Sequence, residues 1–421
     1  MSKTFSFALL AIIPNSVQAR GWLSRMRTRE ACTALLLAIV VVTQSAQAQT
    51  FTLLYAFKGT LTDGCNPLGS VIMDKQHDLY GTTEQCGSSS DGTAWELSSG
   101  GTETLLYNFT GSDGATPRAG MILDAMGNLY GTTYYGGSAS YGTVYRLGSG
   151  GGETVLHSFT GGSSDGEHSF GGLIRDVSGN LYGTTVQGGS SYCGGYGCGI
   201  VFELSSSGTL TVLHTFTGSD GDGAYPAYGS LLMDAKGNLY GVTPAGGDLS
   251  CPKKNGPGCG VVYKLSKSGK FKVLHRFTGG SKDGCPYGTL VMDTDGSLYG
   301  TTSGCGSSGS GTVFKLTKDG TETVLHNFAG GGSDGLSPVA GVVRDKNGNL
   351  YGTTEIGGAF DNGTLYRLSA SGKLTLLHSF TGGSDGASPM GGLIRDAKGN
   401  FYGTASLGGS YGYGTVFEVT P

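Results

Sequence analysis

Histidine is the residue type in this chain with the clearest potential for metal or acid–base chemistry, because imidazole binds transition metals and titrates near neutral pH. Five histidines recur in the motif Leu-His-x-Phe, and tyrosine takes the same place in two further copies: His157, His214, His275, His326, His378, Tyr55 and Tyr107. A position that accepts both side chains favours an amphipathic packing site. Copies on separate repeats also cannot meet around one ion, so we predict no metal centre.

Aspartate forms a second recurring group, which closes a short apolar run in every repeat: Asp74, Asp124, Asp176, Asp234, Asp293, Asp345 and Asp396. An aspartate beside a turn readily accepts backbone N–H groups, so we predict a structural role for these residues. Closely spaced carboxylates in Asp293-Thr-Asp-Gly296 and Asp220-Gly-Asp-Gly223 could bind Ca²⁺. Both segments lack the later glutamate of an EF-hand loop, so we expect no cofactor and keep Ca²⁺ as the alternative.

Catalytic and nucleic-acid-binding motifs are missing. No Gly-x-Ser-x-Gly segment opens a helix, and no phosphate-binding loop or dinucleotide fingerprint occurs. The segment Ser90-Asp-Gly-Thr-Ala-Trp95 is similar to the Asp-box of sialidases, but it occurs once and fits a variant of a recurring Gly-Thr-Val-Phe strand. The formal charge is −4 without a basic block in the body of the chain, which argues against a nucleic-acid partner. We predict no catalytic residue, and catalysis stays an open alternative.

The N-terminus carries the pattern of an export signal. Ala31 to Val42 is a twelve-residue apolar run broken only by Thr33, with arginines before it and Ala46-Gln47-Ala48 after it. Such a run is too short to span a bilayer, and the small residues suit signal peptidase. We therefore predict a signal peptide over residues 1–48, with Met26 as an alternative true start and an uncleaved anchor as the rival interpretation. The mature protein is expected to be secreted, extracellular or periplasmic, with no membrane span.

Cysteine usage agrees with export, since eight cysteines follow residue 48 and an even number predicts disulfides. Cys65 and Cys285 both follow Asp-Gly, and Cys86 and Cys305 both come after Tyr-Gly-Thr-Thr with two residues between. We predict the bridges Cys65–Cys86, Cys193–Cys198, Cys251–Cys259 and Cys285–Cys305. A zinc site is the rival interpretation, but no pair shows the Cys-x-x-Cys spacing.

The elements that position these residues belong to one unit that recurs seven times. Its Leu-Tyr-Gly-Thr-Thr-like segment has tyrosine at Tyr80, Tyr130, Tyr182, Tyr240, Tyr299, Tyr351 and Tyr402. The successive spacings of 50, 52, 58, 59, 52 and 51 residues are close to the roughly 40–50 residues of propeller blades. Each unit contains four strand-like runs, for example Gly172–Asp176, Asn180–Thr185, Gly199–Leu204 and Leu210–Phe216. Many of the 80 glycines supply turns, including Asp-x-x-Gly hairpins.

These repeats predict an all-β fold, a seven-bladed β-propeller of four-stranded blades that spans residues 49–421 as a single domain. If the Leu-Ile-Arg-Asp run is the innermost strand, the last unit lacks its outer strand. The unpaired run Thr50–Phe57 can supply that strand next to Gly414–Thr420. The N-terminal strand would thus complete the C-terminal blade and leave no exposed sheet edge, and we expect a monomer.

The repeated motifs resemble a known family. Leu350–Thr354, Gly357-Gly358, Gly363–Tyr366 and Leu377–Phe380 together resemble the GloVer tandem-repeat family of secreted bacterial proteins, over residues of about 50 to 421. The resemblance implies an extracellular protein with no catalytic assignment to transfer. Members are often joined to surface anchors, and the sequence printed here ends at Pro421 without one, which favours a released protein. The Asp-x-x-Gly-Asn-Leu-Tyr hairpin is also similar to NHL and lactonase-type propeller blades.

Candidate ligand-binding residues lie where the repeats differ. In the predicted arrangement, the loops with Asp-Gly and those with Gly-Gly emerge on one face, and the Asp-x-x-Gly hairpins lie on the other. The variable loops carry aromatic and polar residues, Tyr134, Tyr135, Tyr141, Tyr192, Tyr196, Tyr225, Tyr287, Phe360, Tyr411 and Tyr413 with Glu84, Gln85, Gln187, Glu355 and Asp361. Exposed aromatics among polar groups suit sugar or peptide binding.

We therefore predict a non-catalytic propeller that binds an extracellular glycan or protein through this Tyr-rich, disulfide-stapled face. A metal-assisted hydrolase or lactonase with a site in the central channel is one alternative. A purely structural surface protein is another.

Overall fold

The computed structural model describes residues 49–190, 192–226, 229–251 and 258–420. The predicted signal peptide, including Met26, lies outside the described residues. Gln49–Pro421 forms one compact unit. Among the described residues, no helix has the length and apolar character needed to cross a bilayer.

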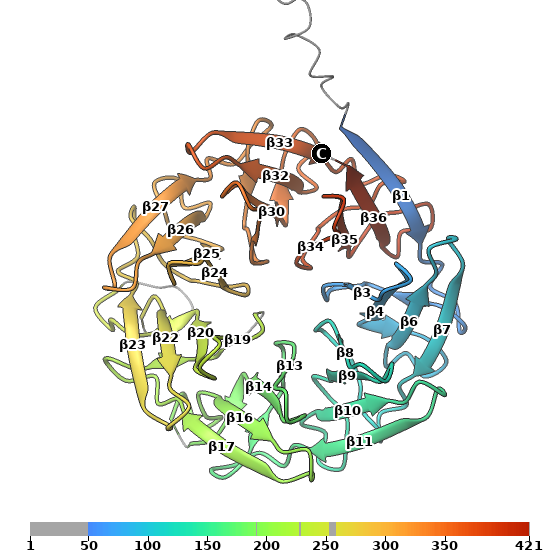
Figure 1. Cartoon of the computed structure of the whole chain (residues 1–421), viewed down its shortest axis with the longest axis horizontal. Helices are drawn as coiled ribbons and strands as arrows, with labels where there is room; N and C mark the ends of the chain where they lie inside the picture. Colours follow the sequence, from blue (N-terminus) through green and yellow to red (C-terminus); the bar gives the residue numbers. More distant parts are fainter. Residues whose placement is uncertain (1–48, 191, 227–228, 252–257, 421) are drawn as a thin grey trace, which may run out of the picture. The chain divides into compact units, whose positions relative to one another are not determined.

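Seven four-stranded antiparallel sheets surround a central channel as the blades of a propeller (Figure 1). From blade 1 to blade 7 the innermost strands are β3 (Ile72–Met73), β8 (Ile122–Leu123), β13 (Ile174–Arg175), β19 (Leu232–Met233), β24 (Val291–Met292), β29 (Val343–Arg344) and β34 (Ile394–Arg395). The second strands are β4 (Leu79–Thr83), β9 (Leu129–Thr132), β14 (Leu181–Thr185), β20 (Leu239–Thr243), β25 (Leu298–Thr302), β30 (Leu350–Thr354) and β35 (Phe401–Ala405). The all-β, seven-bladed prediction is confirmed.

The outer half of each blade holds the longer strands. The third strands are β6 (Thr93–Leu97), β10 (Thr143–Leu147), β16 (Ile200–Leu204), β22 (Val261–Leu265), β26 (Thr312–Leu316), β32 (Thr364–Leu368) and β36 (Thr415–Thr420). The outermost strands are β7 (Glu103–Asn108), β11 (Glu153–Ser158), β17 (Leu210–Thr215), β23 (Phe271–Arg276), β27 (Glu322–Asn327), β33 (Leu374–Ser379) and, for blade 7, β1 (Thr50–Ala56).

Blade 7 is built from both ends of this unit. Its strand order is β1-β36-β35-β34, and β1 runs antiparallel to β36 with Thr50 opposite Thr420 and Ala56 opposite Thr415. The backbone N–H of Phe57 extends the pairing to Gly414 O. The predicted closure by the N-terminal strand is therefore confirmed.

The recurring aspartates shape the hairpins between the first two strands. Oδ1 of Asp176 accepts the backbone N–H groups of Ser178 and Asn180, and Oδ2 accepts the Tyr182 hydroxyl. Burial alone would raise the pKa of Asp176, but these hydrogen bonds outweigh it and lower that pKa. The other six units repeat the contact between tyrosine and aspartate. The predicted structural role of these aspartates is confirmed.

Aromatic pairs between adjacent blades recur through the core, which also contains buried leucine and valine side chains. The phenylalanine of each Leu-His-x-Phe-like motif is fully buried and contacts the central aromatic ring of the next blade's third strand. The seven pairs, with centroids 4.9–5.5 Å apart, are Phe57–Trp95, Phe109–Tyr145, Phe159–Phe202, Phe216–Tyr263, Phe277–Phe314, Phe328–Tyr366 and Phe380–Phe417. The glycine of each Leu-Tyr-Gly-Thr-Thr-like segment makes room for that ring. At Gly81, for example, an added Cβ would lie 2.3 Å from Trp95.

Candidate functional site

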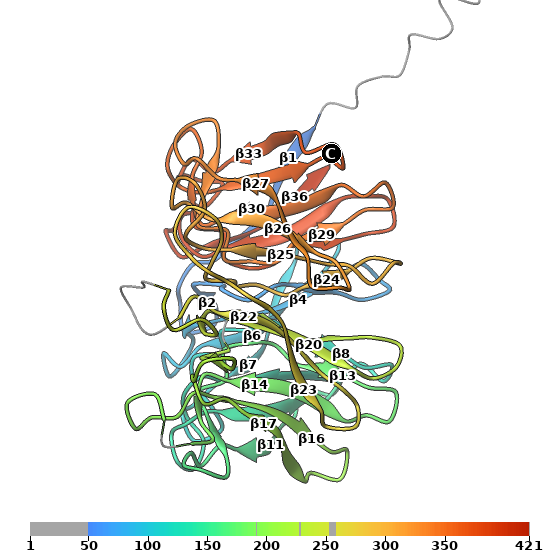
Figure 2. The same cartoon turned by 90° about the vertical axis from the view of Figure 1, so that its left-hand side faces the viewer.

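The two faces of the ring differ in construction (Figure 2). We call variable face the one formed by the Asp-Gly loops and by the loops between second and third strands, and hairpin face the opposite one. Short ladders join the two kinds of loop in four blades: β2 (Gly64–Cys65) with β5 (Gln85–Cys86), β12 (Gly166–Glu167) with β15 (Gln187–Gly188), β18 (Gly223–Ala224) with β21 (Ala245–Gly246), and β28 (Gly335–Leu336) with β31 (Ile356–Gly357). The two sets of loops therefore share one face, as predicted.

Backbone hydrogen bonds between neighbouring blades, which we call backbone straps, connect the loops of this face. Each Asp-Gly loop holds one non-glycine residue in the left-handed region, with φ of 51–61°: Asn66, Thr116, His168, Tyr225, Cys285, Ser337 and Ser388. Its N–H donates to a carbonyl of the preceding blade over 2.8–2.9 Å, as from Asn66 to Tyr413 O and from His168 to Tyr141 O. A left-handed conformation costs roughly 1–2 kcal/mol for such residues. In all seven loops this conformation accompanies the interblade hydrogen bond.

Disulfides add to these straps. Bridges join Cys65 to Cys86, Cys193 to Cys198, and Cys251 to Cys259, as predicted. Cys65–Cys86 links β2 to β5 across the ladder of blade 1. Cys285 Sγ and Cys305 Sγ lie 3.7 Å apart at the equivalent place in blade 5. Their predicted bond stays a prediction.

Seven of the predicted aromatic residues are exposed, with 36–68 % of their surface accessible: Tyr135, Tyr141, Tyr192, Tyr196, Phe360, Tyr411 and Tyr413. They come from the loops between the second and third strands of blades 2, 3, 6 and 7. Tyr134, Tyr225, Tyr287, Glu84 and Glu355 are half-buried. The structure therefore places the exposed aromatics on one face, but it does not gather all of the predicted residues into one pocket.

Arg118 organises a cluster across blades 1 to 3. Its Nε donates to Glu84 Oε1 over 2.8 Å, and its guanidinium lies 4.0 Å from the centroid of Tyr134 and 5.1 Å from that of Phe170. The ring of His168 stacks on Tyr134 at 4.7 Å, and its Nδ1 lies 2.9 Å from Tyr134 O. Because Arg118 and His168 cover Tyr134, that ring braces the loop, and the neighbouring Tyr135 and Tyr141 present the accessible rings.

Sequence reasoning missed the central residues of this cluster. Arg118 and His168 occur once each at their places in the repeat, so the recurring motifs did not select them. Their departure from the repeat was the available signal, because a unique charged or aromatic residue within a repeated loop marks broken symmetry.

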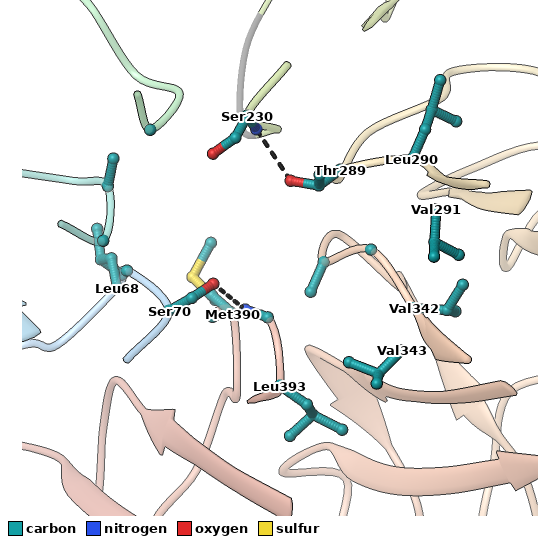
Figure 3. Close-up of a pocket in the computed structure, with 18 of the residues that line it drawn as sticks. Leu68, Ser70, Ser230, Thr289, Leu290, Val291, Val342, Val343, Met390 and Leu393 are labelled. Atoms are coloured by element: carbon teal, nitrogen blue, oxygen red, sulfur yellow. Dashed lines mark hydrogen bonds between the residues drawn. The ribbon is translucent and has the colours of Figure 1, made fainter. Parts of the chain in front are cut away.

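A cavity of about 400 Å³ lies in the central channel. Its wall is apolar, with Leu68, Leu290, Val342 and Leu393, and it carries small polar groups from Ser70, Ser230 and Thr289 (Figure 3). Ser230 N donates to Thr289 Oγ1, and Gly392 N donates to Ser70 Oγ. Arg118 and Arg344 also line the cavity, and the described lining residues include no carboxylate, imidazole or thiol.

The histidines of the Leu-His-x-Phe motif form hydrogen bonds that sequence reasoning missed. Each histidine or tyrosine at this position meets the aspartate of the following Asp-Gly loop over 2.6–3.3 Å: Tyr55–Asp63, Tyr107–Asp113, His157–Asp165, His214–Asp222, His275–Asp283, His326–Asp334 and His378–Asp385. Tyrosine and histidine are interchangeable here because both present a ring donor to a carboxylate. The packing role that we predicted is thus incomplete, and the signal was the aspartate that follows seven or eight residues later in most copies.

These aspartates also accept backbone donors. Asp165 is buried and accepts hydrogen bonds from His157, Thr160 and Gly166. Burial would raise the pKa of Asp165, but the hydrogen bonds, led by that from His157, lower it below the ordinary value.

The two segments considered for Ca²⁺ already use their carboxylates. Asp293 accepts the N–H groups of Asp295 and Ser297 and the hydroxyl of Tyr299. In the other segment, Asp222 binds His214, and Asp220 lies 3.6 Å from an Arg276 nitrogen.

We compared the chain with models of known protein families and with known protein sequences. The model of the Gloeobacter/Verrucomicrobia repeat matches residues 39–252, 190–343 and 295–421, in agreement with the predicted resemblance. No curated protein sequence matches the chain.

Among solved structures, virginiamycin B lyase from Staphylococcus aureus has a TM-score of 0.56 at 11 % identity, with 89 % of this chain and 99 % of that chain covered. An extracellular domain from B. thetaiotaomicron, assigned to a hybrid two component system, has a TM-score of 0.54 at 14 % identity, with 89 % and 42 % covered. A gluconolactonase from Xanthomonas campestris has a TM-score of 0.43 at 13 % identity, with 89 % and 90 % covered, and is too distant to support an inference. At these identities the first two share the fold alone with this chain.

Proposed function

We propose that this chain, which belongs to the Gloeobacter/Verrucomicrobia repeat family, is a secreted, non-catalytic β-propeller that binds an extracellular glycan through its variable face. One observation carries the proposal. All seven exposed aromatic side chains of the described residues lie on the variable face, whereas the exposed apolar residues of the hairpins are Met126 and Val177.

The dispersion of these rings favours a glycan over a protein. A protein-binding hot spot needs aromatic anchors that cluster and become fully desolvated. Here the rings sit on loops of four blades, among glycines and polar residues. A tyrosine presents an apolar ring with a hydroxyl at its edge, which matches a sugar that alternates C–H faces with hydroxyl groups.

The straps and disulfides support binding energetically. Ordering of loops is one of the costs that binding must repay. The backbone of Tyr135 pairs with Ala115 of the same blade, and Tyr141 O accepts the N–H of His168 from the next blade. Tyr192 is adjacent in sequence to the Cys193–Cys198 disulfide. Less conformational entropy is therefore lost when a ligand binds.

The residues of the central channel give little support to the alternative function of a metal-assisted hydrolase. A metal site needs carboxylate, imidazole or thiolate ligands that converge. The described residues that line the channel cavity supply none of them. The binding role is therefore the one that the side chains favour.

Arrays of glycans and peptides probed with the mature protein test the proposal. We expect glycan binding that weakens about tenfold or more in the double variant Tyr192→Ala/Tyr196→Ala, which corresponds to about 1.4 kcal/mol. The variant Met126→Ala/Val177→Ala removes exposed apolar groups from the hairpin face and is the matched control. Binding of peptides without glycans would indicate a protein partner instead, and equal losses in both variants would refute the assignment to the variable face.

Secretion is the second part of the proposal. Disulfides are typical of oxidising compartments, and three are present among the described residues. Mass spectrometry of the exported product should find Gln49, or its cyclised form, at the N-terminus. An intact segment 1–48 would contradict cleavage.

A further inference from the structure

The junctions between blades share a three-residue arrangement that we call the junction triad. It contains the histidine or tyrosine of one outer strand, the aspartate of the next Asp-Gly loop, and the residue at the start of the next outer strand. At the junction of blades 3 and 4, for example, His214 contacts Asp222 and stacks on Phe271 with centroids 3.7 Å apart. At the junction of blades 6 and 7, His378 contacts Asp385 and stacks on Phe51 at 3.9 Å.

At six of the seven junctions, the residue type of the third member depends on that of the first member. Two junctions combine tyrosine with glutamate, and four combine histidine with an apolar residue: Tyr55–Asp63–Glu103, Tyr107–Asp113–Glu153, His157–Asp165–Leu210, His214–Asp222–Phe271, His326–Asp334–Leu374 and His378–Asp385–Phe51. The junction of blades 4 and 5 departs from both rules, because it combines His275 and Asp283 with Glu322.

The exceptional triad at the junction of blades 4 and 5 brings together three side chains that can each bind a metal ion. One ligand atom each from His275, Asp283 and Glu322 lie within 4.8 Å of one another, and His275 Nε2 is 3.2 Å from Asp283 Oδ2. Tetrahedral Zn²⁺ with bonds of about 2.0–2.2 Å holds its ligand atoms about 3.4 Å apart. A small shift of the Glu322 side chain therefore completes the ligand spacing.

Glu322 is otherwise poorly accommodated. Its Oε1 is buried, and no donor among the described residues reaches it, as also holds for Oε1 of Glu103 and Glu153 in the tyrosine triads; only at Glu322 does a histidine lie beside it. A cation between the two carboxylates would remove their repulsion and satisfy the unpaired oxygen.

We propose that His275, Asp283 and Glu322 bind one zinc ion, which clamps the outer strand of blade 4 to that of blade 5. The imidazole favours a transition-metal ion such as Zn²⁺ over Ca²⁺ and Mg²⁺, which prefer oxygen ligands. Two carboxylates balance the charge of the ion, and water fills the fourth position. The tyrosine triads bind no zinc, because a neutral phenol is a poor ligand. The other histidine triads lack the third ligand.

The prediction from sequence rested on the exchange of histidine with tyrosine and on whether the histidines could meet one another. Repeated histidines on separate blades do not converge, and that reasoning stands for the motif. It did not consider that one copy meets two carboxylates supplied by the following blade.

The test measures zinc in the oxidised mature protein, after removal of metal by a chelator and incubation with Zn²⁺. Native mass spectrometry should find one zinc ion per chain, and the thermal midpoint should rise with zinc concentration, because a ligand of the folded state stabilises it. Glu322→Leu should abolish both effects. This variant reproduces the histidine, aspartate and leucine of the blade 5–6 junction, so the chain already accommodates such a triad.

Two further variants separate this site from others. Glu153→Leu removes the half-buried glutamate from a tyrosine triad and should leave one zinc ion bound. Leu374→Glu places a third ligand beside His326 and Asp334 and should raise the count to two. Zinc that persists in Glu322→Leu, no zinc in the parent protein, or Ca²⁺ binding at this triad without zinc would each overturn the proposal.

Discussion

His157 Nε2 lies 3.1 Å from Asp165 Oδ2, and this contact joins the outer strand of blade 2 to the loop that leads into blade 3. Because a ring donor meets an aspartate at each of the seven junctions, the ring is held by polar contacts as well as by its aromatic core.

Removal of this aspartate should destabilise the propeller. Asp165→Ala leaves the backbone N–H groups of Thr160 and Gly166 and the ring of His157 without their acceptor, so we expect a loss of about 3 kcal/mol in the free energy of unfolding. Urea denaturation measures the loss. The exposed Asp319 is the control, and Asp319→Ala should leave the midpoint nearly unchanged. Equal effects of the two variants would contradict the role of the junction.

The same aspartate predicts acid sensitivity. Since hydrogen bonds lower the pKa of Asp165 in the folded protein, its contribution is present above the unfolded value of about 3.9 and is lost as the pH falls through the folded pKa. The difference in stability between the parent and Asp165→Asn should therefore shrink below pH 4. A constant difference down to pH 2 would show that the charge of Asp165 is irrelevant.

The half-buried glutamates of the tyrosine triads, Glu103 and Glu153, predict the opposite trend. Burial and the charge of Asp63 raise the pKa of Glu103 to about 7, against smaller opposing effects from Tyr55 and Lys58. Burial and Asp113 likewise raise the pKa of Glu153 to about 7. Their contribution is complete below the unfolded value of about 4.3 and is lost as the pH rises through 7.

Thermal unfolding between pH 4.5 and 8 tests this trend. The parent protein should lose stability over this range, and Glu103→Leu/Glu153→Leu should lose less. Leucine already occupies the equivalent place at Leu210 and Leu374, so the substitution suits the site. An unchanged pH profile in the variant would contradict ionisation of these glutamates as the cause.

Closure of the ring predicts a sensitive N-terminal strand. Phe57 is fully buried against Trp95, and Phe57→Ala should cost about 3–5 kcal/mol. Leu53 lies in β1, which directly precedes Phe57, and is exposed, so Leu53→Ala is the matched control. Deletion of residues 50–57 should expose the edge of β36 and promote association, which size-exclusion chromatography detects. A deletion variant that remains monomeric and stable would refute this closure.

The cysteines predict four bridges on the variable face. Removal of Cys65–Cys86, which spans 21 residues, should cost roughly 3 kcal/mol in the chain-entropy description. Peptide mapping without reduction should find Cys285 linked to Cys305, whose sulfurs already lie 3.7 Å apart. Pairs that join different repeats, or thiols at these two positions that react with alkylating reagents, would contradict the predicted set.

The sequence was most informative where the repeat has a local physical cause. The spacing of Tyr182 and its equivalents marks one blade each, and Asp176 and Gly179 fix a hairpin whose hydrogen bonds span only a few residues. The spare strand at the N-terminus identified the closure because blade 7 would otherwise lack an edge partner. These features needed no knowledge of contacts between blades.

The candidate site was harder to predict, because its contacts cross between blades. Tyr134 is covered by Arg118 of the preceding loop and by His168 of the next blade, so its type alone suggested an exposed ring. Asp165 marked a turn in the sequence, but its meeting with His157 depends on how adjacent blades pack. Such partners are fixed by tertiary structure and carry no periodic signal of their own.

The pairing of Thr50 with Thr420 has a mechanical consequence. Whatever precedes Thr50 and whatever follows Thr420 depart from adjacent positions at the open end of one antiparallel ladder. Tension between those flanking segments would load the hydrogen bonds of β1 and β36 one pair at a time, as in unzipping. The propeller would therefore yield under low force when pulled by its two ends.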